Sequence, residues 1–118
     1  MKNFICKILA VFFCCSYFSF MTIAQNTGIF EGGNDIGPVL HKGSVVYDKR
    51  NGEYQISGWG ANIWGTQDEA HIAWRKLKGN FILQARARFV GEGVDPHRKL
   101  GWMIRTSLAP DAASVNTA

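Results

Sequence analysis

The stretch WGANIWGTQDEAH, residues 59–71, combines aromatic, acidic and imidazole side chains within a short span. An indole ring can stack on the apolar face of a sugar ring, while carboxylate and imidazole atoms can bond the sugar hydroxyls. Trp59, Trp64, Asp68 and His71 are therefore candidate ligand-binding residues for a glycan. The alternative for the two tryptophans is that they seal the end of a hydrophobic core, since each indole buries a large apolar area.

A second group of polar residues lies in the stretch GVDPHRKLGWMIRTS, residues 93–107. The Asp95-Pro96 pair indicates a turn between two strands, because proline holds the preceding residue in an extended conformation. Positive charge gathers after this turn, and Arg98 and Arg105 are candidate contacts for an anionic ligand or an acidic partner surface. A solvated basic loop is the simpler interpretation. No nucleophile with an adjacent base accompanies these residues, so nothing here predicts catalysis.

The carboxylates do not have the spacing of a glycoside hydrolase. Asp68 and Glu69 are adjacent, so in a strand their side chains point to opposite faces and cannot flank one glycosidic bond. The alternating Glu-x-Asp-x-Glu arrangement of β-jelly-roll glucanases does not occur in this sequence. We therefore predict that the protein is not an enzyme.

Metal binding has little support in the sequence. His41, His71 and His97 are scattered, with no second histidine at strand or helix spacing, which argues against zinc. Asp35, in the stretch GGNDIG, and Asp95, directly before a proline, are candidate calcium ligands, because calcium favours oxygen atoms from loops. An Asx turn is the simpler interpretation of both aspartates. No metal site and no other cofactor is therefore predicted.

The first 24 residues have the organisation of a secretory signal peptide. Lys2 and Lys7 precede an apolar run that extends from Ile8 to about residue 20. The segment then ends in small residues at Ala24, as a signal-peptide cleavage site does. The run is shorter than the roughly 20 apolar residues of a membrane-spanning helix, which argues against an anchor. Bulky Phe12 and Phe13 before the cysteine pair argue against lipidation. We predict cleavage after Ala24 and export to the periplasm, the cell surface or the extracellular space, with no membrane span after cleavage.

The rest of the chain, residues 25–118, is predicted to form one small domain or part of one. All three cysteines lie before it, so no disulfide is expected within it. The whole chain has 13 Lys and Arg against 9 Asp and Glu, and the loss of Lys2 and Lys7 leaves a mild positive charge. Nucleic acid is not an expected partner, because its binding requires clustered positive charge.

Alternating segments predict five strands. The first two flank Asn51-Gly52, a pair typical of a hairpin turn. The fourth is the clearest, because its apolar residues fall on one face and its arginines on the other. Trp74 and Trp102 lie in alternating segments and are expected to pack in the core, whereas residues 26–43, with five glycines, are expected to be irregular. The five segments are SVVYD (44–48), EYQISGW (53–59), EAHIAWRKL (69–77), FILQARARFVG (81–91) and KLGWMIRTS (99–107).

No segment has the apolar spacing of a helix, so the predicted class is all-β, an antiparallel β-sandwich or jelly roll. Five strands bury only a modest core, and SVNTA at residues 114–118 looks like the start of a further strand. We therefore expect an incomplete sandwich, truncated at the C-terminus. Its unpaired edges favour aggregation, chiefly along residues 81–89.

A family resemblance runs through residues 28–108, in the strings GIFEGGNDIG, GSVVYD, YQISGWGANIW, DEAHIAWRKLKGNFILQARARFVG and GVDPHRKLGWMIRTSL. This part of the chain resembles the N-terminal module of secreted bacterial TolB-like propeller proteins. That module belongs to the concanavalin A-like lectin/glucanase superfamily and is related to laminin-G-type sandwiches. The resemblance implies a β-jelly-roll that binds rather than cleaves, within a larger exported protein that has a propeller or hydrolase domain downstream.

Together these observations predict a secreted, non-catalytic binding module that recognises a glycan or another cell-envelope component. The face expected to bind it contains Trp59, Trp64, Asp68, His71, Arg98 and Arg105. The alternative is a structural or interaction domain that docks onto a downstream propeller or hydrolase domain, with the two tryptophans at the interface. An aromatic patch suits either use.

Overall fold

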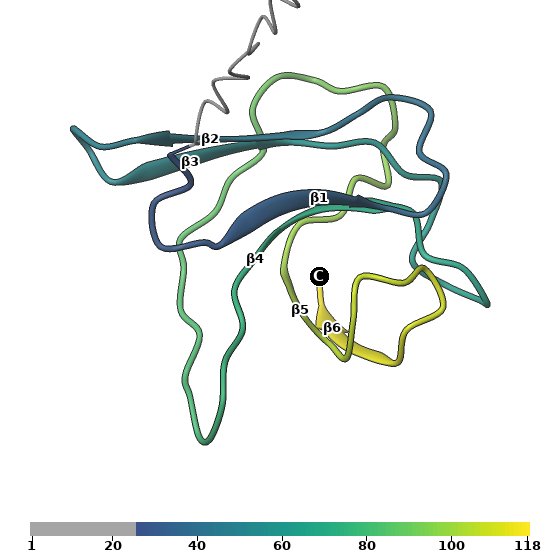
Figure 1. The fold of residues 1–118 in the computed structure, drawn as a ribbon. Helices are drawn as coiled ribbons and strands as arrows, with labels where there is room; N and C mark the ends of the chain where they lie inside the picture. Colours follow the sequence, from purple (N-terminus) through teal and green to yellow (C-terminus); the bar gives the residue numbers. More distant parts are fainter. Residues whose placement is uncertain (1–25) are drawn as a thin grey trace, which may run out of the picture.

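The computed structural model describes residues 26–118, and the predicted signal peptide, residues 1–24, lies outside them. Within this range three antiparallel pairs of short strands make up the regular structure (Figure 1). β1 pairs with β4, β2 with β3, and β5 with β6. The predicted all-β class is therefore confirmed, with small antiparallel sheets. The strands are β1 (Gly32–Ile36), β2 (Ser44–Asp48), β3 (Glu53–Ser57), β4 (Ala70–Trp74), β5 (Trp102–Arg105) and β6 (Ser114–Thr117).

The β2–β3 hairpin follows directly from its turn sequence. Gly52 has a φ of 72°, and its N–H donates to the Asp48 carbonyl at 2.9 Å. The register places Tyr47 opposite Tyr54, and their rings stack with centroids 4.6 Å apart. Such an aromatic pair adds about 0.5–1.5 kcal/mol beyond the burial of its area. The hairpin predicted at Asn51-Gly52 is confirmed.

β1 forms where the sequence predicts an irregular segment. Its glycines lie against side chains of neighbouring strands. A Cβ on Gly33 would lie 2.7 Å from Val45 Cγ2, and a Cβ on Gly32 would lie 3.2 Å from the Trp74 ring. These glycines therefore permit close packing of β1 against β2 and β4 instead of marking turns. The prediction for residues 26–43 is wrong at residues 32–36 for this reason.

Residues 81–91, the clearest strand in the sequence, form no strand in the structure. The segment leaves the tip of the long hairpin that follows β4 and runs past the sheets without joining one (Figure 1). An alternating pattern suits a sheet, but a strand requires backbone N–H and C=O groups paired with a neighbour. No strand within residues 26–118 pairs with this segment. The prediction is therefore wrong for the described fold.

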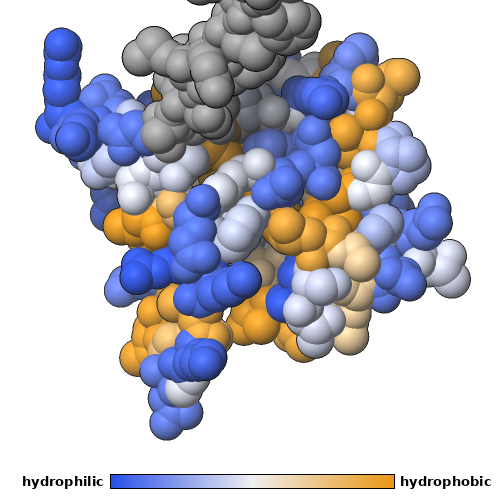
Figure 2. Space-filling view, in the orientation of Figure 1, coloured by the Kyte–Doolittle hydropathy of each residue, from blue (hydrophilic) through white to orange (hydrophobic). Residues whose placement is uncertain are grey.

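The hydrophobic core is small and lies between the β1–β4 and β2–β3 sheets. Ile36 of β1 is fully buried, and Val45 of β2 is 7% exposed. Trp74 and Trp102, predicted to lie in the core, are half-buried, and the Trp74 indole N–H donates to Asn34 Oδ1 at 2.7 Å. Hydrophobic side chains also reach the surface, notably just above the hairpin tip after β4 (Figure 2). Residues 26–118 contain no helix with the length and apolarity to cross a membrane.

One polar contact joins these two sheets. Asp35 Oδ1, on β1, lies 2.7 Å from His71 Nδ1 of β4 and accepts a hydrogen bond from the Gly43 N–H at 2.9 Å. A side chain on Gly43, just before β2, would overlap the His71 ring, and one on Gly58, just after β3, would come within 2.8 Å of His71 Cβ. The His71 side chain is only 4% exposed as a result. We call Asp35, Gly43, Gly58 and His71 the His71 junction.

The close fit at Gly43 predicts the cost of adding one methyl group. Gly43→Ala should destabilise the protein by about 1–3 kcal/mol, because the new methyl group enters the space of the His71 ring. Urea denaturation measures the free energy of unfolding. Ser44→Ala, at the exposed neighbouring position, is the control and should change it by less than about 0.5 kcal/mol. Equal stabilities of the two variants would contradict this packing.

Asp35 should make the stability depend on pH. The hydrogen bond from His71, and then that from the Gly43 N–H, lower the pKa of Asp35 below its ordinary value of 3.8. A carboxyl group whose pKa is lower in the folded state stabilises the fold above its unfolded pKa. This contribution is therefore present above pH 3.8 and is lost as the pH falls through the folded-state pKa.

Asp35→Asn isolates that contribution. The variant should be less stable than the wild type at about pH 7, and the difference should shrink as the pH falls below 3.8 and through the lowered pKa of the folded-state carboxyl group. Urea denaturation across this range gives the difference directly. Asp95→Asn is the matched control, because Asp95 is exposed and makes only local contacts. A stability difference for Asp35→Asn that stays constant across the range would contradict the assignment.

Candidate functional site

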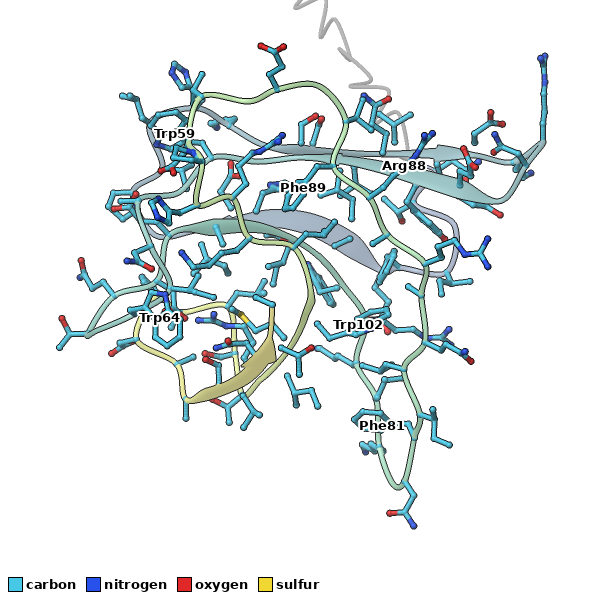
Figure 3. The ribbon with its side chains drawn as sticks, turned by 180° about the vertical axis from the view of Figure 1, so that it is seen from behind. Trp59, Trp64, Phe81, Arg88, Phe89 and Trp102 are labelled. Carbon is cyan, nitrogen blue, oxygen red and sulfur yellow. The ribbon has the colours of Figure 1, made fainter. Side chains whose placement is uncertain are left out.

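The six predicted ligand residues do not form a single face. Trp59 lies near the β2–β3 sheet and Trp64 lies near the β5–β6 hairpin, well apart (Figure 3). The Trp59 ring meets the His41 ring edge-on, with centroids 5.2 Å apart. His71 is enclosed in the His71 junction. Only Trp64, Asp68 and Arg105 are brought into one neighbourhood.

The basic loop after Asp95 forms its own local cluster. The Arg98 guanidinium lies 4.6 Å above the centroid of the Phe89 ring, and its Nη1 donates to the Gly91 carbonyl at 3.0 Å. Asp95 Oδ1 accepts the His97 N–H at 2.7 Å, so the Asx turn predicted there is confirmed. At Asp35 the same prediction is wrong, because the partners of that carboxylate lie eight and 36 residues along the chain.

Asp68 and Arg105 form a buried ion pair. Arg105 Nη1 donates to Asp68 Oδ2 at 2.8 Å, and the two side chains are 5% (Arg105) and 10% (Asp68) exposed. The guanidinium also donates to the carbonyls of Ser107 at 2.8 Å and Ala109 at 2.6 Å. The Asp68 N–H donates to the Pro110 carbonyl at 2.9 Å. These bonds tie the β5–β6 turn to the chain just before β4 and engage the Arg105 guanidinium within the protein.

An open hollow of about 560 Å³ lies beside this ion pair. One wall is the loop that carries Trp64, whose side chain projects with 67% of the residue exposed. The opposite wall is the β5–β6 turn and the start of β6. We call this site the Trp64 hollow. Its lining residues are Ile63, Trp64, Gly65, Thr66, Asp68, Pro110, Asp111, Ala112, Ala113, Ser114 and Asn116.

The lining of the Trp64 hollow is polar and contains two acids and no basic residue. Asp68 is nine-tenths buried, and its Oδ2 is held by Arg105, while Oδ1 accepts no hydrogen bond from the described residues. Asp111 is exposed on the facing turn. This arrangement offers hydrogen-bond acceptors beside an exposed indole. It therefore suits a ligand that has hydroxyl or amine donors and one apolar face.

The carboxylates of Asp68 and Glu69 bond to different segments. Glu69 Oε2 accepts the Ala61 N–H at 3.2 Å, whereas Asp68 bonds to Arg105. Residues 26–118 contain no cluster of three or more acidic, histidine or cysteine residues suited to a metal ion. The candidate calcium ligand Asp35 has its Oδ1 engaged by His71 and the Gly43 N–H.

Half of the Trp64 hollow was not expected from the sequence. Asp111 precedes, and Ser114 and Asn116 lie within, residues 114–118, for which the sequence indicates only the start of a further strand. Their hydroxyl, amide and carboxylate groups are common in turns, so residue type alone does not mark them. The Asp68 N–H bond to Pro110 brings this stretch to Trp64, and no local spacing predicts such a contact.

The Asp68–Arg105 pair should be important for stability. Arg105→Leu should cost about 3–5 kcal/mol, because it leaves the Asp68 carboxylate buried without its partner. Arg88→Leu, at an exposed position, is the matched control and should have little effect. Combining Arg105→Leu with Asp68→Leu should recover most of the loss, since no buried charge then remains. Urea denaturation of these variants measures the effect, and an Arg105→Leu protein as stable as the control would refute it.

No family model matches the chain, and comparisons with curated proteins and with solved structures give no match either.

Proposed function

We propose that this protein is an exported, non-catalytic module with a lectin-like β-sandwich fold that binds a glycan or a related component of the cell envelope. The observation that carries the proposal is the exposed Trp64 indole at the side of an open, polar hollow. An aromatic ring beside hydrogen-bond acceptors is the arrangement that recognises a sugar ring, whose faces are apolar and whose edges carry hydroxyl groups.

The individual residues of the Trp64 hollow have complementary roles in this proposal. Trp64 stacks on one face of the sugar. The buried Asp68 carboxylate, oriented by Arg105, accepts a hydroxyl hydrogen bond through Oδ1. Asp111, Ser114 and Asn116 contact hydroxyls from the facing turn. Because the lining includes acids and no base, a neutral sugar is favoured over a uronic acid or a phosphorylated sugar.

The separate partners of Asp68 and Glu69 support binding without cleavage. A glycosidase needs two carboxyl groups facing one bond across a cleft. The Glu69 carboxylate instead accepts a hydrogen bond from the Ala61 N–H, eight residues earlier in the chain. The signal-like residues 1–24 support export, the predicted location of such a module.

A second candidate function is that of an interaction domain in a larger exported protein. Its support is the amount of hydrophobic surface outside the Trp64 hollow: Ile82 is 94% exposed, Val94 85% and Val90 72%. Surfaces of this kind mark contacts with another protein. If the protein is an interaction domain, the exposed residues Ile82, Val90 and Val94, and not Trp64, contact the partner protein.

Trp64→Ala should weaken glycan binding by about tenfold or more, since it removes the stacking surface. A glycan array identifies the bound sugar, and titration calorimetry then gives the affinity of each variant. Trp59→Ala is the matched control, because Trp59 lies outside the hollow beside His41, and it should bind as the wild type does. Equal binding by the wild type and Trp64→Ala, or no glycan bound at all, would remove the proposal in favour of the interaction domain.

A further inference from the structure

The Trp64 hollow gathers negative charge on a chain that is positive as a whole. The full sequence has 13 Lys and Arg against 9 Asp and Glu, and residues 26–118 also contain more basic than acidic residues. The lining of the hollow nevertheless includes Asp68 and Asp111 and no basic residue. A hollow lined by charge of one sign raises the local concentration of ligands of the opposite sign. The hollow therefore favours a cation that the rest of the chain does not attract.

The one base that pairs with the lining is held outside the hollow. Arg105 donates to Asp68 Oδ2 and to the carbonyls of Ser107 and Ala109, and its side chain is 5% exposed. A ligand in the hollow therefore does not contact this guanidinium. Arg105 offsets the charge of Asp68, so the net negative charge comes from Asp111, which is exposed and makes no ion pair within residues 26–118.

Asp68 supplies an acceptor that is already oriented. The residue is only 7% exposed and lines the hollow, and the bond from Arg105 to Oδ2 fixes its carboxylate. Oδ1 accepts no hydrogen bond from the described residues, and a carboxylate oxygen can only accept one. A buried acceptor gains most from a charged donor, because hydrogen bonds with an ionised partner are roughly twice as strong as neutral ones.

We infer that the Trp64 hollow selects a sugar that carries a protonated amine. This inference rests on the proposed function, because it assigns the class of sugar to the same site. The ammonium group donates to Asp68 Oδ1, Asp111 supplies the opposite charge, and the sugar ring stacks on Trp64. The exposed indole adds to the preference, since its π face attracts positive charge. A neutral sugar can donate a hydroxyl to the same oxygen but gains no attraction from Asp111.

An ammonium group suits the hollow better than a metal ion. Calcium takes six to eight oxygen ligands, and residues 26–118 contain no cluster of three or more acidic, histidine or cysteine residues. One of the two carboxylates in the hollow is already bonded to Arg105. An amine needs only a few acceptors, and the sugar that carries it uses the Trp64 surface as well.

Three tetramers that differ only at the second carbon of each ring test the inference. They consist of β1,4-linked glucosamine, N-acetylglucosamine or glucose, which carry an ammonium, an acetamide or a hydroxyl group there. Titration calorimetry with the purified protein at about pH 6, where an amine is protonated, gives the three affinities. The glucosamine tetramer should bind about tenfold more tightly than the other two, because it alone brings a charged donor. Raising NaCl from about 50 mM to about 500 mM should reduce this preference.

Two variants change the charge of the hollow. Asp111→Asn removes the charge and keeps the size of the side chain, so it should lower the preference for the glucosamine over the glucose tetramer by about threefold. Thr66→Lys adds a positive charge at an exposed lining position and should lower it by a similar factor. Asp95→Asn and Gln55→Lys make the same changes at exposed positions outside the hollow and should keep the wild-type preference. Circular dichroism checks that each variant is folded.

The outcomes separate this inference from the proposed function. Binding of a neutral sugar that depends on Trp64, with no preference for the glucosamine tetramer, would overturn the inference and leave the proposed function standing. A preference unchanged by both Asp111→Asn and Thr66→Lys would also overturn it, because the amine would then be bound elsewhere. Absence of binding to any sugar would overturn both.

Discussion

The hydrogen-bonded contact between Asp35 and His71, enclosed by Gly43 and Gly58, is the constraint on which the arrangement of the sheets depends. Asp35 and His71 are cross-strand partners within the β1–β4 sheet. The junction reaches the β2–β3 sheet through the bond from the Gly43 N–H to Asp35 and through the packing of the imidazole against Gly43 and Gly58. His71 Nε2 is buried without a hydrogen-bond partner among the described residues, so the bond at Nδ1 orients the ring. Since a carboxylate can only accept, Nδ1 carries a proton. The glycines are required because the ring occupies the space that their side chains would fill.

The start of β4 connects all three sheets. His71 of β4 packs against Gly43 and Gly58 at the ends of β2 and β3. Three residues earlier, Asp68 bonds to Arg105 of β5 and to the Pro110 carbonyl in the β5–β6 turn. The hydrophobic core is too small to order these short pairs by burial alone. Buried polar contacts therefore supply much of the geometric definition. They also form the Trp64 hollow, whose two walls come from the segments that Asp68 brings together.

Short paired strands leave much backbone and apolar surface unpaired. Few of residues 26–118 are fully buried, and the edges of their short sheets are exposed to pairing with another molecule. Residues 80–90 lie in the unpaired stretch between β4 and β5, and they combine apolar side chains with two arginines. The hollow and this segment lie on different parts of the chain. The proposed ligand and the proposed protein contact therefore involve separate surfaces.

Local sequence determined the features that need only neighbouring residues. The hairpin turn at Asn51-Gly52, the Asx turn at Asp95 and most strand positions follow from alternation and turn chemistry. Tertiary structure alone decided features that require a distant partner. Residues 32–36 became a strand because β4 pairs with them, and residues 81–91 did not because no strand of residues 26–118 pairs with them. The six predicted ligand residues were separated for the same reason. His71 bonds to Asp35 and Arg105 bonds to Asp68, each more than 30 residues away in the chain. The spacing of residues along the sequence does not predict such contacts.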